Sequence, residues 1–309
     1  MSDFPGLTIS CPLFFNSDES IDFETLERYL DNVCQNKNIS AVYSMAYNTR
    51  YRMLRDDELL EVNAFVIKKV KSFGHSVYVG HPYVFTRSSL DKYLSSIANL
   101  KPSGVSMLYP ERYYGLDDFV IEFLRAPFHH GIDVVLHEMK LVSGFDGSLV
   151  DWPVQLLERV FDEVPLVAVK EDSKSDEIAL RVLELCKQKG VHFVLAGGGK
   201  VRALKFLDKG MTTWLNGSTM FLPQLIDRTY TAFVAGDKTY QAQYLDTIEK
   251  PFFEAVVSKH GWHLAHKAAL EFFGYGERFE RFPHARMSNA SYASVKPTLE
   301  QISVSSRDI

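Results

Sequence analysis

The sequence predicts an α/β protein, a (β/α)8 TIM barrel followed by a C-terminal helical extension. Short apolar runs recur roughly every thirty residues, about the length of one βα unit. Amphipathic helical patterns lie between these runs. No G-x-G-x-x-G follows the first run, so the main sign of a dinucleotide-binding sheet is missing. Eight strand candidates that alternate with helices favour a closed barrel over an open doubly wound sheet.

The strand candidates are short and apolar, as expected for parallel strands that are covered on both faces. They are residues 7–11, 41–44, 76–80, 104–108, 133–137, 166–170, 193–196 and 211–215. The segments between them carry apolar stripes at helical spacing. The clearest stripes are formed by Leu26, Tyr29, Leu30 and Val33, by Leu59, Val62, Phe65, Val66 and Val70, and by Ile178, Val182, Leu183 and Leu185.

The alternation of strands and helices ends after Asn216, and only helical patterns continue to Gly274. We therefore predict a barrel over residues 1–225 and a helical extension over residues 226–287. Residues 288–309 are polar and rich in serine, a composition typical of a loosely ordered tail.

Composition excludes several classes of function. The chain has 309 residues, 46% of them hydrophobic, which is enough for a large core. Its net charge of -5 argues against nucleic acid or an anionic membrane as a partner. It contains neither a membrane-spanning run nor a signal peptide pattern. Cys11, Cys34 and Cys186 are odd in number and widely spaced, so they fit neither a disulfide framework nor a zinc cluster. We expect a soluble, cytoplasmic protein.

One lysine lies at the end of an apolar strand candidate. Lys170 follows Leu166-Val167-Ala168-Val169 and precedes two acidic residues. Ligands bind at the carboxyl ends of the strands in parallel α/β proteins. A lysine held against apolar walls has a lowered pKa, and its neutral amine can attack a carbonyl. The alternative is a lysine that reaches solvent or pairs with Glu171 or Asp172.

The run Val167-Ala168-Val169-Lys170-Glu171-Asp172-Ser173 resembles the V-G-I-K-x-x-S of one known family. That family is the dihydrodipicolinate synthase/N-acetylneuraminate lyase family of class I aldolases, in which this lysine forms a Schiff base. Weaker matches occur in the family's order. They are Pro12 with Phe14 and Phe15, Ile21-Asp22-Phe23, Tyr109-Pro110 with Tyr113-Tyr114, Ala196-Gly197-Gly198-Gly199, Lys267-Ala268-Ala269-Leu270 and Arg281-Phe282-Pro283.

The resemblance implies a lyase that forms an imine between Lys170 and a 2-oxo acid such as pyruvate. It implies no cofactor, because the imine itself is the electron sink. It also implies a homo-oligomer, a dimer or a tetramer, and it covers the chain from Leu7 to Pro283.

The segment aligned with the family's carboxylate-binding G-T-T-G-E departs from the family pattern. It reads Ala46-Tyr47-Asn48-Thr49-Arg50, so both glycines and the glutamate are absent. We expect Tyr47, Asn48, Thr49 and Arg50 to bind substrate in a reshaped pocket, with Arg50 or Arg52 contacting an anionic group. The alternative is that both arginines are solvated. This departure argues against the dihydrodipicolinate synthase reaction and favours a sugar-acid aldolase or dehydratase.

The proton-relay residues also differ. His137 occupies the position of the family's strand-end tyrosine, and an imidazole can act as acid or base near neutral pH. Either Tyr113 or Tyr114 aligns with the family's second relay tyrosine. We therefore predict Lys170, His137, Tyr113 and Tyr114 as catalytic residues.

Three further features bear on the site. Gly197 and Gly198 open a helix near the seventh strand candidate, where barrels bind anions, although a tight turn explains them equally well. His81 lies at the end of the third strand candidate, and we expect it to line the mouth of the barrel. The spacing of His260, His263 and His266 invites a metal site, but the first and third do not share a helix face, so we predict none.

Two rival functions remain open. One is a binding protein on the same scaffold, which holds a small carboxylate or sugar acid without turnover. The other is a barrel enzyme that uses Lys170 only as an electrostatic clamp. Fold-level analogy does not choose among these, because function depends on the site.

Overall fold

Eight parallel strands close into a barrel in the computed structural model, in the order β1 to β8. The structure describes residues 5–44, 53–81, 86–108, 117–138, 154–196 and 199–309. The strands are β1 Gly6–Ser10, β2 Ile39–Ser44, β3 Ser76–Gly80, β4 Gly104–Leu108, β5 Val134–Glu138, β6 Leu166–Glu171, β7 His192–Leu195 and β8 Thr213–Leu215. The predicted fold and all eight predicted strands are confirmed, with boundaries that differ by two residues or fewer at each end.

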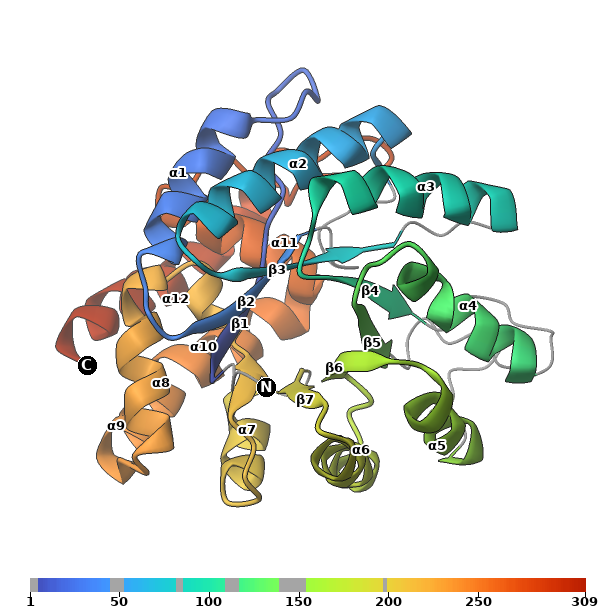
Figure 1. Ribbon diagram of the computed structural model, residues 1–309. Helices are drawn as coiled ribbons and strands as arrows, with labels where there is room; N and C mark the ends of the chain where they lie inside the picture. The colour runs from blue at the N-terminus through green and yellow to red at the C-terminus, as the bar shows by residue number, and fades with distance from the viewer. Residues whose placement is uncertain (1–4, 45–52, 82–85, 109–116, 139–153, 197–198) are drawn as a thin grey trace.

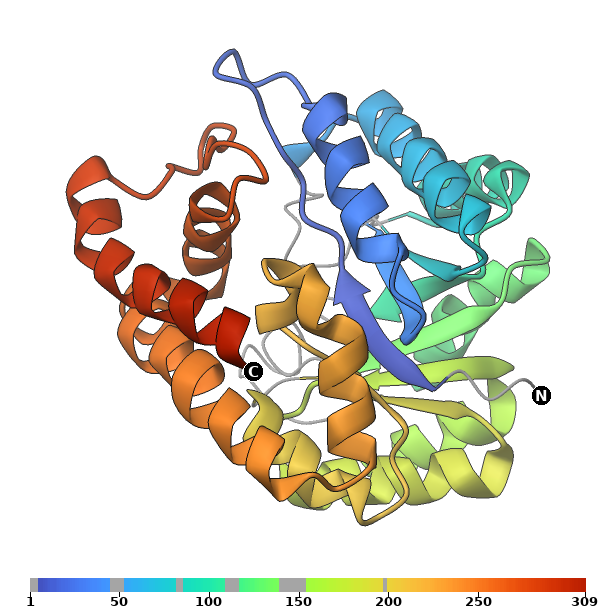
Figure 2. The ribbon, with the colours of Figure 1, turned by 90° about the vertical axis from the view of Figure 1, so that its left-hand side faces the viewer.

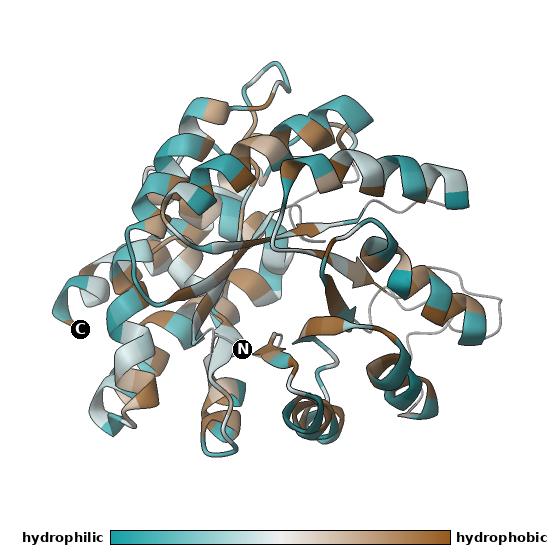
Figure 3. Ribbon diagram, viewed as in Figure 1, coloured by the Kyte–Doolittle hydropathy of each residue, from teal (hydrophilic) through white to brown (hydrophobic). Residues whose placement is uncertain are grey.

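Helices alternate with the strands and surround the barrel (Figure 1). They are α1 Phe23–Cys34, α2 Asp56–Ser72, α3 Arg87–Leu100, α4 Asp117–His129, α5 Val154–Glu163, α6 Asp176–Lys189, α7 Gly199–Leu207 and α8 Ile226–Val234. The predicted stripes on α1, α2 and α6 lie against the strands, and Figure 3 shows apolar residues concentrated in the strands. Strand alternation explains why these stripes meet a continuous apolar outer surface of the barrel.

The core has two parts because successive strand residues point to opposite sides of the sheet. Leu136 and Val169 point outward and join the large cluster between strands and helices. Residues on the alternate positions form a separate cluster that fills the inside of the barrel. This inner cluster consists of Ala41, Tyr43, Tyr78, Val135 and Ala168. Any site at the carboxyl ends of the strands therefore lies directly next to this inner cluster.

Helices continue after the barrel, as predicted. They are α9 Lys238–Tyr244, α10 Lys250–Phe252, α11 Ser258–Phe272 and α12 Asn289–Asp308, with π-helical turns at Leu245–Glu249 and Phe253–Val257. In Figure 2 the red α12 lies along the orange helices that precede it, and α12 contacts both α10 and α11.

The expectation of a loosely ordered tail over residues 288–309 is wrong. Ser288 caps a helix of 20 residues by accepting a hydrogen bond from the Ser291 amide. Val295, Leu299 and Ile302 recur at helical spacing and are buried. The serines dominate the composition, but this sparse apolar stripe is sufficient to dock the helix once α10 and α11 offer a surface.

Candidate functional site

Lys170 and Glu171 are neighbours on β6 with opposite orientations. Ala168, two residues before Lys170, belongs to the inner cluster, so Lys170 points into the barrel. Glu171 points outward toward α7, where its carboxylate lies 3.1 Å from the Arg202 guanidinium. The alternative in which Lys170 pairs with Glu171 is therefore wrong, because strand geometry separates the two side chains.

Lys170 is buried at the carboxyl end of β6, with 5% of its surface exposed. Its Nζ lies 5.2 Å from the centre of the Tyr43 ring, across the barrel on β2. Among the residues that the structure describes, none forms a hydrogen bond or an ion pair with this amine. Burial lowers the pKa of Lys170 to about 8, and the charge of Lys174 adds to this while Asp172 opposes it. A substantial neutral fraction exists near pH 8.

His137 lies opposite Lys170 in the β5–β6 pairing and points the same way. Its ring is buried, and Nε2 makes no hydrogen bond within the described part of the chain. Burial and the nearby Lys170 charge lower the pKa of His137 to about 4, although Asp172 opposes the shift. The imidazole is therefore neutral at physiological pH and able to accept a proton.

Asp172 lies just beyond β6, close to both Lys170 and His137. The sequence did not mark it as a site residue. Its Oδ2 lies 3.9 Å from His137 Nε2, and its Oδ1 contacts Lys174. Burial would raise the pKa of Asp172, but the contact with His137 and the charges of Lys174 and Lys170 outweigh this and hold it at about 2. Asp172 is therefore an anion at neutral pH, beside the two candidate catalytic groups.

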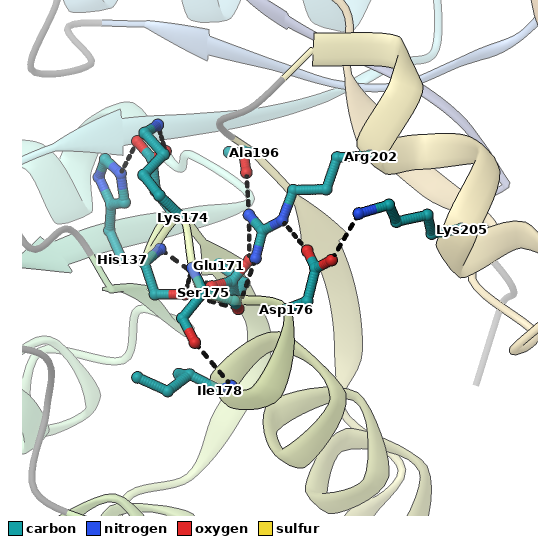
Figure 4. A network of polar contacts seen from close by, with 11 residues as sticks. His137, Glu171, Lys174, Ser175, Asp176, Ile178, Ala196, Arg202 and Lys205 are labelled. Carbon is teal, nitrogen blue, oxygen red and sulfur yellow. Dashed lines mark hydrogen bonds and ion pairs between the residues drawn. The ribbon is translucent and has the colours of Figure 1, made fainter.

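The outward side of the β6 end is a closed polar network (Figure 4). Glu171 accepts hydrogen bonds from the Ser173 amide and hydroxyl. Arg202 donates to the carbonyls of Ala196 and Ser175 and pairs with Asp176, which also pairs with Lys205. Burial raises the pKa of Glu171 against the opposing effect of Arg202. This network ties α7 to the ends of β6 and β7 and fixes the backbone that carries Lys170.

Two more polar groups inside the barrel were missed by the sequence analysis. Tyr43 Oη and Ser10 Oγ are buried and have no hydrogen-bond partner among the described residues. Leu7 and Ile9 of β1 belong to the outer core, so Ser10 shares the inward direction of Tyr43. Inward positions of strand candidates, read by alternation from Lys170, are the signal that could have found them.

His81 follows β3 and is buried. Its Nδ1 lies 3.1 Å from the Ser106 carbonyl, and its ring packs edge-on against Phe123 of α4. These contacts orient the ring toward β4 and α4. A role for His81 in substrate binding stays a prediction.

The histidines of α11 have separate surroundings. His266 contacts the carbonyls of Trp262 and Gly217, and His263 lies 3.1 Å from Glu280. No group of three histidine, cysteine or carboxylate side chains within the described ranges has the arrangement of a metal site.

Eight predicted site residues lie outside the residues that the structure describes. They are Tyr47, Asn48, Thr49, Arg50, Tyr113, Tyr114, Gly197 and Gly198. In the sequence they follow strands β2, β4 and β7.

The fold and the site together define a class of protein: a (β/α)8 barrel with a buried lysine of lowered pKa at the carboxyl ends of its strands. No family model matches the chain, and no curated protein matches it. Solved structures do match.

YagE from E. coli K12 is a prophage protein of the dihydrodipicolinic acid synthase family and was solved in complex with pyruvate. It has 15% sequence identity to this chain and a TM-score of 0.81, and the match covers 98% of this chain and 99% of its own. The 4-hydroxy-tetrahydrodipicolinate synthase of Methylacidiphilum fumariolicum SolV has 17% identity and a TM-score of 0.81 over 98% and 97%. Dihydrodipicolinate synthase from Aquifex aeolicus has 16% identity and a TM-score of 0.79 over 97% and 98%.

The chain therefore has the fold of the dihydrodipicolinate synthase family along nearly its whole length. This confirms the resemblance at the level of the fold. In the described part of the chain, no helix has the length and apolar character needed to cross a membrane.

Proposed function

We propose that this protein is a class I lyase of the dihydrodipicolinate synthase/N-acetylneuraminate lyase family, an aldolase or dehydratase that acts on a 2-oxo acid through an imine on Lys170. The observation that supports this most directly is the buried Lys170 amine. It faces the inside of the barrel and has a pKa lowered to about 8 by burial. A neutral amine held at the ligand-binding end of a barrel is suited to attack on a ketone.

The chemistry follows from the amine. The Nζ lone pair attacks C2 of the 2-oxo acid, and water leaves to form an iminium ion. The iminium withdraws electrons from the neighbouring carbon, so a C–C or C–O bond can break or form there. His137 would move protons, helped by Tyr113 or Tyr114. The substrate carboxylate would lie near Asn48 and Thr49 with Arg50, and the altered loop favours a sugar-acid-like substrate.

Borohydride trapping tests the proposal. The protein is incubated with pyruvate or longer 2-oxo acids, reduced, digested with trypsin and mapped by mass spectrometry. An adduct on Lys170 blocks cleavage there, so the peptide of residues 160–174 replaces that of residues 160–170. Lys267 provides a matched control, since it is also buried but donates to the Leu13 carbonyl. An adduct on Lys267, or no adduct with any of these acids, would refute the proposal.

The binding-protein alternative predicts a different result. A binder would show ligand-dependent thermal stabilisation that survives Lys170→Ala, with no turnover before or after the substitution. An enzyme that uses Lys170 only as a clamp would keep its turnover in the presence of borohydride.

We also propose that the protein is a homo-oligomer, either a dimer or a tetramer. The support for this is the family resemblance. Sedimentation equilibrium over a range of protein concentrations measures the mass directly, and a monomer at all concentrations would contradict it.

A further inference from the structure

Asp172 continues the inward positions of β6 by one step. Its amide donates to the Glu138 carbonyl at 2.9 Å, which extends the β5–β6 ladder beyond Glu171. Positions 168, 170 and 172 therefore share one side of the backbone. Lys170 and His137 lie opposite each other just below, so the carboxylate stands at the barrel mouth beside both.

The two oxygens of this carboxylate have different surroundings. Oδ1 contacts the Lys174 ammonium, while Oδ2 lies 3.9 Å from His137 Nε2. Lys174 makes this contact from a left-handed backbone conformation, with φ of 67°. Figure 4 shows Lys174 and His137 together on one side of the β6 end, with Arg202 and Lys205 on the other. One oxygen is anchored, and the second is directed at an imidazole nitrogen that has no hydrogen bond in the described part of the chain.

We propose that Asp172 is a positioning residue for proton transfer, which stabilises the His137 imidazolium formed during the reaction. This inference rests on the proposed imine chemistry of Lys170. In the step concerned, a nitrogen of the His137 imidazole takes a proton from C3 of the iminium. The C3–H electron pair becomes the C2=C3 double bond, and the C=N π pair moves to nitrogen. A cationic iminium and a neutral imidazole become a neutral enamine and an imidazolium.

The position of Asp172 suits this step because the total charge of the site stays the same and one positive charge moves from one group to another. Before the transfer the charge is on the Lys170 nitrogen, and afterwards it is on the His137 ring. Both groups lie next to the same anion, so no charge is left uncompensated inside the barrel at either stage. A fixed charge that already points to where the new charge develops needs no reorganisation.

The charged groups that face His137 in the described structure are Lys170, Asp172 and Lys174, which are the groups that influence its protonation. Glu138 and Glu171 follow the outward alternation of their strands. Asp172 is the single anion of this set. Its removal should therefore weaken His137 as a base more than it affects the attack by Lys170.

The test compares Asp172→Asn with the wild type, using pyruvate as the probe and two readouts over a range of pH. Borohydride trapping at Lys170 reports imine formation. Exchange of the pyruvate methyl hydrogens in D2O, followed by proton NMR, reports removal of the C3 proton. We expect trapping to persist, with its midpoint moved to lower pH because Asp172 raises the pKa of Lys170. We expect exchange to fall roughly a hundredfold.

Asp162→Asn is the matched control. It makes the same chemical change in an exposed aspartate paired with Lys189, away from the barrel mouth. It should leave both readouts unchanged. Asp172→Glu should recover part of the lost exchange, because it restores the charge at a slightly different place.

The outcomes separate the two proposals. Undiminished exchange in Asp172→Asn would overturn the positioning role while the imine proposal stands. Loss of trapping in Asp172→Asn would also overturn it, since Asp172 would then act on imine formation or on folding. No trapping in the wild type would overturn the proposed function itself and this inference with it.

Discussion

The inner and outer sides of β6 differ in whether a buried charged side chain has a partner among the described residues. On the outer side, Glu171 is fully buried but is bonded to Ser173 and paired with Arg202. On the inner side, Lys170 is buried to a similar degree, yet it forms neither a hydrogen bond nor an ion pair with any described residue. The two side chains are adjacent in sequence.

This difference separates structure from function. A buried charge that is paired and hydrogen-bonded holds its surroundings in place, and breaking the pair is costly. A buried charge without a partner costs stability, and such groups cluster at functional sites. The outer network thus stabilises the strand end, whereas the inner groups are those that the proposed chemistry would use.

Lys170→Met should have the largest effect and should separate activity from stability. We expect covalent capture to disappear and turnover to fall by at least about a thousandfold. At pH 7 the free energy of unfolding should rise by up to about 3 kcal/mol, the equivalent of the pKa shift to about 8. The wild type should regain this difference as the pH rises from about 8 to 10.5, where the unfolded lysine loses its proton.

Urea denaturation at several pH values measures this effect. Lys267→Met is the control, because it leaves the Leu13 carbonyl without its donor and should destabilise the protein. A loss of stability in both variants would show that Lys170 is a structural lysine.

Arg202→Met removes the cation that pairs with Glu171 on the outer side of β6 and should lower stability. It leaves the Glu171 carboxylate buried without its cation, and we expect a loss of about 3–5 kcal/mol. Because burial already raises the pKa of Glu171, this loss should grow as the pH rises. Combining Arg202→Met with Glu171→Gln should restore part of the stability. An additive double mutant in urea denaturation would argue against the pairing.

His137→Phe should change how the free energy of unfolding depends on pH in the acidic range. The pKa of His137 is lowered from 6.5 to about 4, so the folded state binds fewer protons than the unfolded state between these values. Wild-type stability should therefore fall by up to about 3 kcal/mol as the pH drops from 6.5 to 4. Asp172, whose pKa is about 2, contributes only at lower pH. Thermal unfolding should be less pH-dependent in the variant, and an unchanged slope would contradict this.

Lys174→Gly should have the smallest effect. It relieves a left-handed backbone, as does Lys101→Gly at the end of α3, where φ is 55°. Lys101→Gly should stabilise the protein by about 1 kcal/mol, and Lys174→Gly by less, because it also loses the contact with Asp172. Only Lys174→Gly should raise the pKa of Lys170, visible as a trapping profile moved to higher pH. Equal effects of both variants on that profile would refute the electrostatic role of Lys174.

Much of the barrel could be predicted because its signals are local. The apolar run before Lys170 and the helical stripe of α6 are periodic over one element, so neither needs knowledge of the rest of the chain. The error at α12 has the same origin. Val295, Leu299 and Ile302 form a stripe too sparse to stand out among serines, and it becomes meaningful only beside the surface of α10 and α11.

By itself, the sequence determined the alternation of strands and helices and the position of Lys170 at a strand end, since both depend on residue spacing along one element. The tertiary structure decided which charges meet. Arg202 reaches Glu171 from another βα unit, Tyr43 reaches Lys170 from across the barrel, and Asp172 turns toward His137 on a neighbouring strand. Such pairings depend on barrel closure and on the direction of each side chain, which residue spacing within one element does not specify.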